Sequence, residues 1–321
     1  MMQMNVIRLL ALVMVGTVAG CATPKSGILV MAHGGDDVWN RDVEATVEPL
    51  RRHYPVEIAF GMARTSTLRD AVARLEQRGV KRIAVVRMFI SGESFVPETE
   101  YILGLRSELP PALHAAPAAA GADHCAEKAE PIPVKASLVV SRDGVADSPL
   151  VDDILLDRAR ALSTIPSQES VLILAHGPGD DAENERWLAN MRLRSRRLQE
   201  AGRFKAVRCE TLREDWPEKR GPAEKRIRDF VQNSTEAGER VIVLPFRVAG
   251  FGPYREVLEG LSYTADGRGF CPHPNMTTWI ERTAQQCFAT ADTVGTVARP
   301  ASRAELRDRR AGSDNPSAHP N

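Results

Sequence analysis

The sequence predicts an α/β protein made of two similar domains, each a mainly parallel sheet with helices on both faces. Short apolar runs alternate with amphipathic stretches of helical length, which is typical of parallel sheets covered by helices. The second half of the chain repeats this order. Both halves open with an apolar run followed by Ala-His-Gly and, shortly after, by Asp-Asp. Duplication of one α/β unit explains these three observations.

The apolar runs predict buried strands. Ile28–Ala32 is an unbroken apolar run that ends at a glycine pair, as expected for a strand covered on both faces. The predicted strands of the first half are ILVMA (28–32), VEIAF (56–60), RIAVVRMFI (82–90) and VKASLVV (134–140). Those of the second half are VLILA (171–175), FKAVRCE (204–210) and RVIVLPFRVAG (240–250).

The segments between these strands have the length and apolar spacing of helices. In the segment 66–79, Leu68, Val72 and Leu75 share one face and Gly79 ends the helix. The other predicted helices are 38–53, 96–109 and 149–162 in the first half, and 183–202, 222–238 and 272–286 in the second.

The two halves also agree in register. Arg82 and Gly92 are separated by the same number of residues as Arg240 and Gly250. A linker is expected near 163–169. The predicted division of the chain is a signal peptide at 1–20, domains at 26–165 and 168–288, and a disordered tail at 289–321.

The composition fits a globular protein and gives no case for nucleic-acid binding. Hydrophobic residues make up 43% of the chain and charged residues 26%. Lys+Arg and Asp+Glu both number 42, so the net charge is zero and no basic excess is available for a phosphate backbone. No apolar run after residue 20 is long enough to span a bilayer.

The N-terminus predicts export and a lipid anchor. Arg8 precedes the apolar run Leu9–Val15, which is too short for a membrane span but suits a signal peptide. The following Val-Ala-Gly-Cys matches a bacterial lipobox, so cleavage before Cys21 and lipidation of that residue are expected. An ordinary signal peptide with a chance cysteine is the alternative. Because Ala22 is not aspartate, we expect a periplasm-facing protein, with the outer membrane favoured as its location.

Export permits disulfides, and the connectivity stays open. The cysteines after the lipobox are Cys125, Cys209, Cys271 and Cys287, which allow three pairings. The sequence has no Cys-x-x-Cys pattern, so a zinc knuckle is not expected. The long, Ala- and Pro-rich connection 110–131, which contains His124, is expected to be a mobile flap over the cleft.

The two repeated histidines are the strongest candidates for a functional site. His33 and His176 each directly follow a predicted strand. Ligands of open parallel sheets bind beyond the carboxyl ends of the strands, and two facing domains form a cleft there. Each histidine is therefore expected to point into that cleft. The plainer alternative is that each histidine only hydrogen-bonds its own loop.

Other site chemistries fit less well. The turns after the histidines lack the Gly-x-Gly-x-x-Gly spacing, and paired aspartates would repel a phosphate, so a nucleotide cofactor is not expected. No Gly-x-Ser-x-Gly elbow is present for a serine hydrolase.

The repeated pattern resembles the sirohydrochlorin cobaltochelatases and ferrochelatases, the class II chelatases. The resemblance covers roughly residues 27–286 and rests on ILVMAHGGDD, TSTLRDAVARLEQRGVKRIAVVRMFISG, ADSPLVDDILLDRA, VLILAHG and FCPHPNMTTWI. It implies two Rossmann-like domains and insertion of a divalent metal, Co²⁺ or Fe²⁺, into a tetrapyrrole without a nucleotide. The family uses a histidine after the first strand, a glutamate at the end of the second, and a histidine beyond the glycine that ends the third.

Carried over to the second half, the resemblance assigns His176 to the first position and Glu210 to the second. It makes His176, Glu210 and His33 the candidate catalytic and metal-binding residues. His273, within FCPHPN, is a further candidate for ligand binding, and its alternative role is packing at the start of a helix.

The first half is less complete. Met62 stands near the position of the glutamate, and the third histidine is absent from both halves, where Gly-Glu-Ser and Gly-Phe-Gly replace it. Glu93 is a candidate ligand-binding residue that could replace that histidine, or a solvated loop carboxylate.

These departures leave more than one function open. The first hypothesis is a chelatase that acts outside the cytoplasm on a metal ion and a tetrapyrrole. The second is a lipoprotein that binds a metal or a tetrapyrrole without catalysis. A structural lipoprotein on the same fold is the third. The oligomeric state is not predicted.

Overall fold

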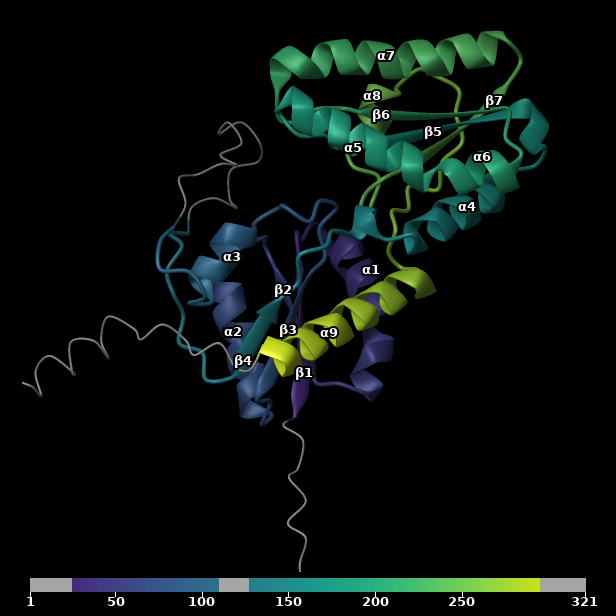
Figure 1. Ribbon diagram of the computed structural model, residues 1–321. Coiled ribbons are helices and arrows are strands. Elements are labelled where there is room, and N and C mark those ends of the chain that lie inside the picture. Colours follow the sequence, from purple (N-terminus) through teal and green to yellow (C-terminus); the bar gives the residue numbers. More distant parts are fainter. Residues whose placement is uncertain (1–24, 110–126, 295–321) are drawn as a thin grey trace, which may run out of the picture.

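The computed structural model describes residues 25–109 and 127–294 (Figure 1). The predicted signal peptide, Cys21, His124, Cys125 and residues 295–321 lie outside these ranges. Within them the chain forms two α/β halves that lie one above the other in Figure 1. No helix in the described ranges is long and apolar enough to cross a membrane.

The first half is built on a parallel sheet in the order β2-β1-β3-β4. Its strands are β1 (Ser26–Ala32), β2 (Val56–Phe60), β3 (Arg82–Arg87) and β4 (Ser137–Val140). The connections contain α1 (Asp37–Val47), the 3-10 helix η1 (Glu48–Arg52), α2 (Thr65–Gln77) and α3 (Val96–Ile102). Asp36 caps α1, because its carboxylate accepts a hydrogen bond from the amide of Trp39 at 2.8 Å.

The second half is built on a parallel sheet in the order β6-β5-β7. Its strands are β5 (Glu169–Ala175), β6 (Ala206–Thr211) and β7 (Arg240–Pro245). The 3-10 helix η2 (Val145–Asp147) follows β4 in the first half. The helices after it are α4 (Leu150–Leu162), η3 (Pro166–Gln168), α5 (Asp181–Arg194), α6 (Arg196–Gly202), α7 (Pro217–Glu236), α8 (Tyr254–Val257) and α9 (Pro274–Val294).

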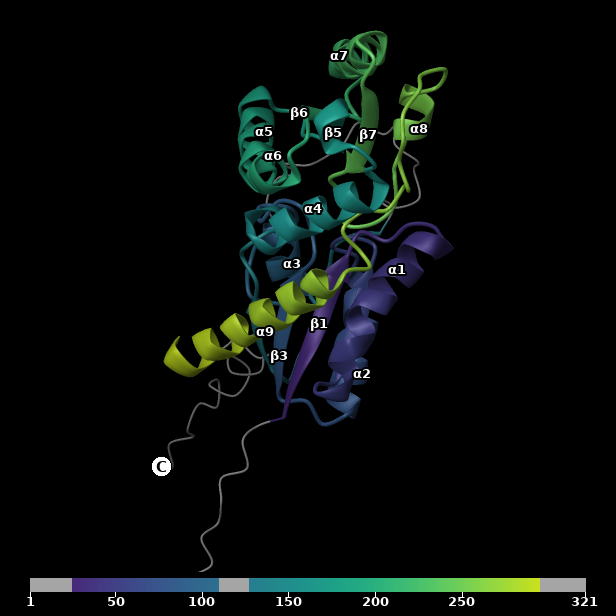
Figure 2. The same cartoon turned by 90° about the vertical axis from the view of Figure 1, so that its right-hand side faces the viewer.

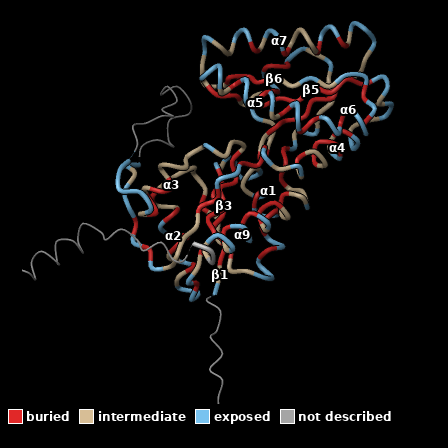
Figure 3. Tube along the Cα trace, viewed as in Figure 1, coloured by how far each residue is buried: buried red, intermediate tan, exposed pale blue. Residues whose placement is uncertain are grey.

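The central strands β1 and β5 are buried on both faces (Figure 3). Because side chains alternate between the two faces of a strand, Val30 and Met31 of β1 pack in different apolar clusters on opposite faces of the sheet. In β5, Ile173 and Leu174 divide in the same way. One apolar cluster contains both Val30 and Ile173, so the two halves share a core on their facing sides.

The two closing helices are exchanged between the halves. Helix α4 follows β4 in the chain but packs against α6 and β7 of the second sheet. Helix α9 follows the second sheet but packs against β1, β3 and β4 of the first (Figures 1 and 2). Thr277 in α9 anchors this return, since its hydroxyl donates to the carbonyl of Thr46 at 2.7 Å.

The linker between the halves is fixed by a buried carboxylate. Glu169 is 1% exposed and accepts hydrogen bonds from the hydroxyl of Ser163, from the amide and hydroxyl of Thr164, and from Arg240. Burial opposes its charged form, but these donors outweigh it and lower the pKa of Glu169 to about 2.

The predicted α/β architecture with two parallel sheets is confirmed. The predicted domain ranges 26–165 and 168–288 are continuous segments of the chain. In the structure α4 packs on the second sheet and α9 on the first, and the order of elements along the sequence does not reveal this exchange. The predicted start of the tail at residue 289 falls inside α9, so residues 289–294 are helical. Cys209, Cys271 and Cys287 are free thiols.

Candidate functional site

His33 and His176 occupy equivalent positions at the carboxyl ends of the two central strands. His33 follows β1 and His176 follows β5. In each case Nδ1 lies 2.8 Å from the carbonyl oxygen of the next residue, Gly34 or Gly177. A carbonyl only accepts hydrogen bonds, so Nδ1 carries the proton and Nε2 of the neutral ring keeps its lone pair.

The turn after β6 brings two carboxylates to His176. The amide of Arg213 donates to the carbonyl of His176 at 2.7 Å, and Arg213 has the left-handed backbone (φ 59°) that turns the chain toward the histidine. Its guanidinium is buried and donates to the carbonyls of Pro178 and Gly179, which fixes the turn. Glu214 and Asp215 come directly after it.

His176 and Asp215 form an ion pair, with Nε2 lying 2.9 Å from Oδ2. Oε2 of Glu214 lies 3.9 Å from the same nitrogen. Burial disfavours the imidazolium, but the hydrogen bond to Asp215 and the charge of Glu214 outweigh it and raise the pKa of His176. The hydrogen bond from His176 in turn lowers the pKa of Asp215, even though burial opposes its charge.

The other half contributes His33 to the same carboxylate. The positive charge of His33 is among the influences that lower the pKa of Asp215, so the two lie within electrostatic reach of each other. The side chain of His33 is exposed. His176 therefore contacts Asp215 directly, and the charge of His33 favours the ionised form of the same carboxylate.

Glu214 is held by a second network. Its Oε1 accepts a hydrogen bond from Nη1 of Arg247 at 2.6 Å, and the guanidinium of Arg247 lies over the ring of buried Tyr254. Trp216 meets the ring of His176 edge-on, with centroids 5.9 Å apart. The hydrogen bond from Arg247 fixes the orientation of Glu214, and the contact with Trp216 restricts rotation of the His176 ring.

Glu210, predicted as the partner of His176, lies on the other face of the sheet. Its carboxylate is paired with Arg208 at 2.6 Å and with Arg226 of α7 at 3.3 Å. The neighbouring Thr211 faces the opposite way and donates to Asn184 of α5. Because strand residues alternate between faces, Glu210 points to α7 and both of its oxygens are taken by arginines. Glu214 and Asp215 supply the acids beside His176 instead.

Glu93 and His273 lie apart from the two histidines. Glu93 is exposed and faces Arg186 of α5, with 3.9 Å between charged atoms. His273 lies where α4 and α9 meet, and its ring accepts from the amide of Asn275 and pairs with Asp157 at 3.4 Å. Burial lowers the pKa of His273. This set of contacts supports the packing role considered for His273.

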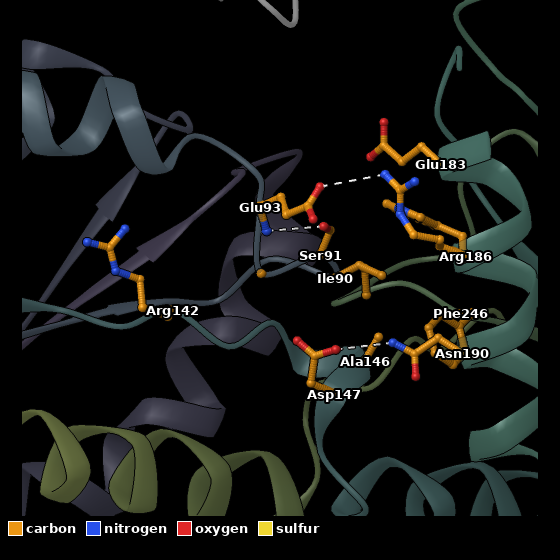
Figure 4. Close-up of a pocket in the computed structure, with 12 residues that line it drawn as sticks. Ile90, Ser91, Glu93, Arg142, Ala146, Asp147, Glu183, Arg186, Asn190 and Phe246 are labelled. Atoms are coloured by element: carbon orange, nitrogen blue, oxygen red, sulfur yellow. Dashed lines mark hydrogen bonds and ion pairs between the residues drawn. The ribbon is translucent and has the colours of Figure 1, made fainter. Parts of the chain in front are cut away.

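A cavity of about 360 Å³ lies between the halves (Figure 4). The first half supplies the loop after β3 and residues of η2, and the second half supplies one face of α5 together with Phe246. Glu93 lines this cavity. These segments lie at the carboxyl ends of the strands, as His33 and His176 do.

The described residues do not form a preassembled metal centre. Within residues 25–109 and 127–294, no three His, Cys, Asp or Glu side chains are close enough to hold a metal ion together. What the site offers is Nε2 of His176 with Asp215 and Glu214 beside it, and His33 opposite. Borderline divalent ions such as Co²⁺ and Fe²⁺ accept imidazole and carboxylate ligands.

The sequence contained a signal for the two acids that was missed. The stretch TLREDWP places Glu-Asp directly after the second strand of the second half, whereas the first half has Ala63-Arg64 at the corresponding turn. The correspondence follows from Met62 (φ 60°) and Arg213 (φ 59°), the left-handed residues of the two turns. The acids beside His176 therefore come from the turn after β6 and not from β6 itself.

Comparisons with known proteins agree with this architecture. Residues 27–160 match the family model CbiX. SirB from Bacillus subtilis with Fe³⁺ is similar in structure, with a TM-score of 0.58 and 14% identity over 85% of this chain and 98% of SirB. The sirohydrochlorin chelatase SirB from Bacillus subtilis subspecies spizizenii, in complex with cobalt, is also similar. It has a TM-score of 0.54 and 13% identity over 85% of this chain and 98% of its own.

A multi-domain protein from Deinococcus radiodurans, described as structurally similar to chelatases, gives a TM-score of 0.51 and 18% identity over 81% of this chain and 55% of its own. At these identities the structural matches show a shared fold. No curated protein sequence matches the chain.

Proposed function

We propose that this chain, whose residues 27–160 match the family model CbiX, is a class II chelatase that inserts a divalent metal into a sirohydrochlorin-type tetrapyrrole at the junction of its two halves. The metal ion, Co²⁺ or Fe²⁺, is a substrate in this reaction. The observation that carries the proposal is the contact of Nε2 of His176 with Oδ2 of Asp215 at 2.9 Å, with Oε2 of Glu214 3.9 Å from the same nitrogen.

These groups suit the two requirements of metal insertion. The metal needs ligands that bind it and then release it, and Nε2 of neutral His176 with the carboxylate of Asp215 forms such a pair. Two pyrrole protons must leave as the metal enters, and carboxylates can accept them. Asp215 and Glu214 are the acceptors beside His176. Where His176 is protonated in its ion pair with Asp215, metal binding to Nε2 must release that proton.

The proposal is tested by mixing the purified protein with Co²⁺ and sirohydrochlorin and following the absorbance of the macrocycle. Insertion should be faster than in the protein-free mixture and should stop when a chelator removes the metal. The variant Asp215→Asn should lose the acceleration, and the exposed aspartate variant Asp70→Asn should keep it. A rate equal to that of the protein-free mixture would refute catalysis.

A non-catalytic binding protein is the second candidate, and one observation favours it. The third-strand histidine of the family is replaced by Ser94 in one half and by Gly252 in the other. A binding protein would retain the metal or the macrocycle without accelerating insertion. The absorbance assay and a metal titration on one sample separate these functions.

We also propose that the protein acts outside the cytoplasm, held to the outer membrane by a lipid on Cys21. The support is the lipobox Val-Ala-Gly-Cys after a short apolar run.

A further inference from the structure

The cavity between the halves has an unusual wall on its α5 side. Glu183, Arg186, Trp187 and Asn190 line it, and their spacing puts them on one face of α5 (Figure 4). A helix face that packs on a core would carry apolar residues at these positions. This face carries one aromatic ring among polar side chains, which suits a ligand that is both flat and charged.

The opposite wall is rigid and partly apolar. Arg87 is 1% exposed and donates to the carbonyls of Gly92 and Ser141 at 2.6 and 2.8 Å, which fixes the two loops on that side. Ile90 and Ala146 line the wall, and Phe246 closes the space from the second half. A cavity held in this way loses little conformational freedom when a ligand enters.

Two arginines line the cavity, and they differ in availability. Arg142 is bonded to Glu100 and turns away from the space between the walls (Figure 4). Arg186 extends toward Glu93 across the cavity mouth, with 3.9 Å between the charged atoms. Both side chains of that pair are more than 60% exposed, so the pair contributes little to stability and is easily exchanged.

We propose that this cavity binds a carboxylate-bearing edge of the macrocycle, with Arg186 pairing with the ligand carboxylate in place of Glu93. Trp187 and Ile90, both half-buried, would contact the flat apolar part of the same pyrrole ring. The inference rests on the proposed function, since it takes a tetrapyrrole as the substrate. It adds a specificity residue on α5, separate from the metal-binding groups at His176.

Substitutions of Arg186 and of Glu93 should change the affinity for a carboxylated porphyrin in opposite directions. Arg186→Ala removes the cation and should weaken binding of a carboxylated porphyrin about tenfold, the size of a charge-assisted hydrogen bond. Arg186→Lys should restore part of that loss. Glu93→Gln removes the competing carboxylate and should tighten binding a few-fold. Arg192→Ala, at an exposed position on the same helix outside the cavity lining, is the matched control and should change nothing.

The experiment is a tryptophan-quenching titration of the full chain with metal-free uroporphyrin, which carries eight carboxylates. A tetra-N-methylpyridyl porphyrin, which has the same flat ring and no carboxylate, is titrated in parallel. The expected result is that Arg186→Ala weakens only uroporphyrin binding. The proposal is overturned if Arg186→Ala matches Arg192→Ala, if both porphyrins weaken alike, or if uroporphyrin does not bind the wild type.

The same samples separate this proposal from the proposed function. If uroporphyrin binding depends on Arg186 but metal insertion is not accelerated, the carboxylate site stands and catalysis fails. If insertion is accelerated and Arg186→Ala has no effect on binding, the site on α5 fails alone. If Arg186→Ala instead tightens Co²⁺ binding, the cavity is a cation site formed by its carboxylates and the proposal is overturned.

Discussion

Nε2 of His176 lies 2.9 Å from Oδ2 of Asp215, and this ion pair lies beyond the carboxyl ends of β5 and β6. The histidine ends a central strand and the aspartate belongs to the turn after the neighbouring strand, so the pair depends on two separate connections. The charge of His33, from the other half, is a smaller influence that also lowers the pKa of Asp215, after the hydrogen bond from His176. The corresponding turn of the first half has Ala63-Arg64 and no acid.

This asymmetry predicts unequal roles for the two histidines. His176→Ala should lower the affinity for Co²⁺ or Fe²⁺ by about 10- to 100-fold, because it removes the imidazole next to two carboxylates. His33→Ala should have a smaller effect. Calorimetric metal titrations of both variants, with melting temperatures alongside, check this. Unchanged metal affinity with a lower melting temperature in both would mean that the histidines only support their loops.

The ion pair should stabilise the fold within a defined pH range. The pKa of His176 is raised, so its contribution is complete below 6.5 and is lost as the pH rises through the raised value. The pKa of Asp215 is lowered, so its contribution is present above 3.8 and is lost on further acidification. Asp215→Asn should therefore destabilise the protein most between pH 3.8 and 6.5, and less as the pH rises above 6.5 through the raised pKa of His176 or falls below 3.8.

Denaturant unfolding of Asp215→Asn and wild type at a series of pH values measures this difference. The exposed Asp70→Asn on α2 serves as the control. A destabilisation by Asp215→Asn that grows steadily toward alkaline pH would contradict the ion pair.

Glu210 should matter for stability and not for metal. Its buried carboxylate is paired with Arg208 and Arg226 on the α7 side of the sheet. Glu210→Gln should lower the free energy of unfolding by about 1–3 kcal/mol, because two arginines lose their charged partner. Metal affinity should equal that of wild type. A clear loss of Co²⁺ affinity in this variant would restore Glu210 as a metal ligand.

Glu169 should be the more costly carboxylate to lose. Hydrogen bonds from Ser163, Thr164 and Arg240 outweigh the effect of burial and lower its pKa from 4.5 to about 2, which corresponds to roughly 3 kcal/mol of stability near neutral pH. Glu169→Gln should lose most of this. The stability present above pH 4.5 disappears as the pH falls through about 2, so variant and wild type should converge in acid. Unfolding curves at pH 7 and pH 2.5 give the comparison.

Lipidation is predicted at Cys21. Cys21→Ser should leave the precursor unprocessed, because the modified cysteine is needed before the signal peptide is removed. Labelled fatty acid should enter the wild type and not the variant. Incorporation into Cys21→Ser would exclude this anchor.

Much of the fold could be predicted because the information is local. The apolar run Ile28–Ala32 became the central strand β1, and the same pattern at 171–175 became β5. The exchange of α4 and α9 could not be predicted in this way. An amphipathic helix has the same apolar pattern whichever sheet it covers, so the pattern does not say to which half the helix returns.

The site was predicted in part for the same reason. The histidines were found because a residue that directly follows a buried strand has a fixed place at the edge of the sheet. Asp215 was missed because its position depends on the left-handed turn at Arg213, whose side chain is held by the carbonyls of a different loop. Glu210 was chosen because it is the last acid within the strand, but the alternation of the strand directs it to α7.

The exchange of the closing helices has a consequence for biosynthesis. The ribosome completes the four strands of the first sheet by Val140, but the helix that covers one of its faces ends at Val294. Until those last residues have been made, side chains such as Val30 and Val86 lack their final neighbours. The core of the first half therefore cannot be completed until α9 has been made, so this apolar face stays uncovered for longer than one closed by the helix next in the chain.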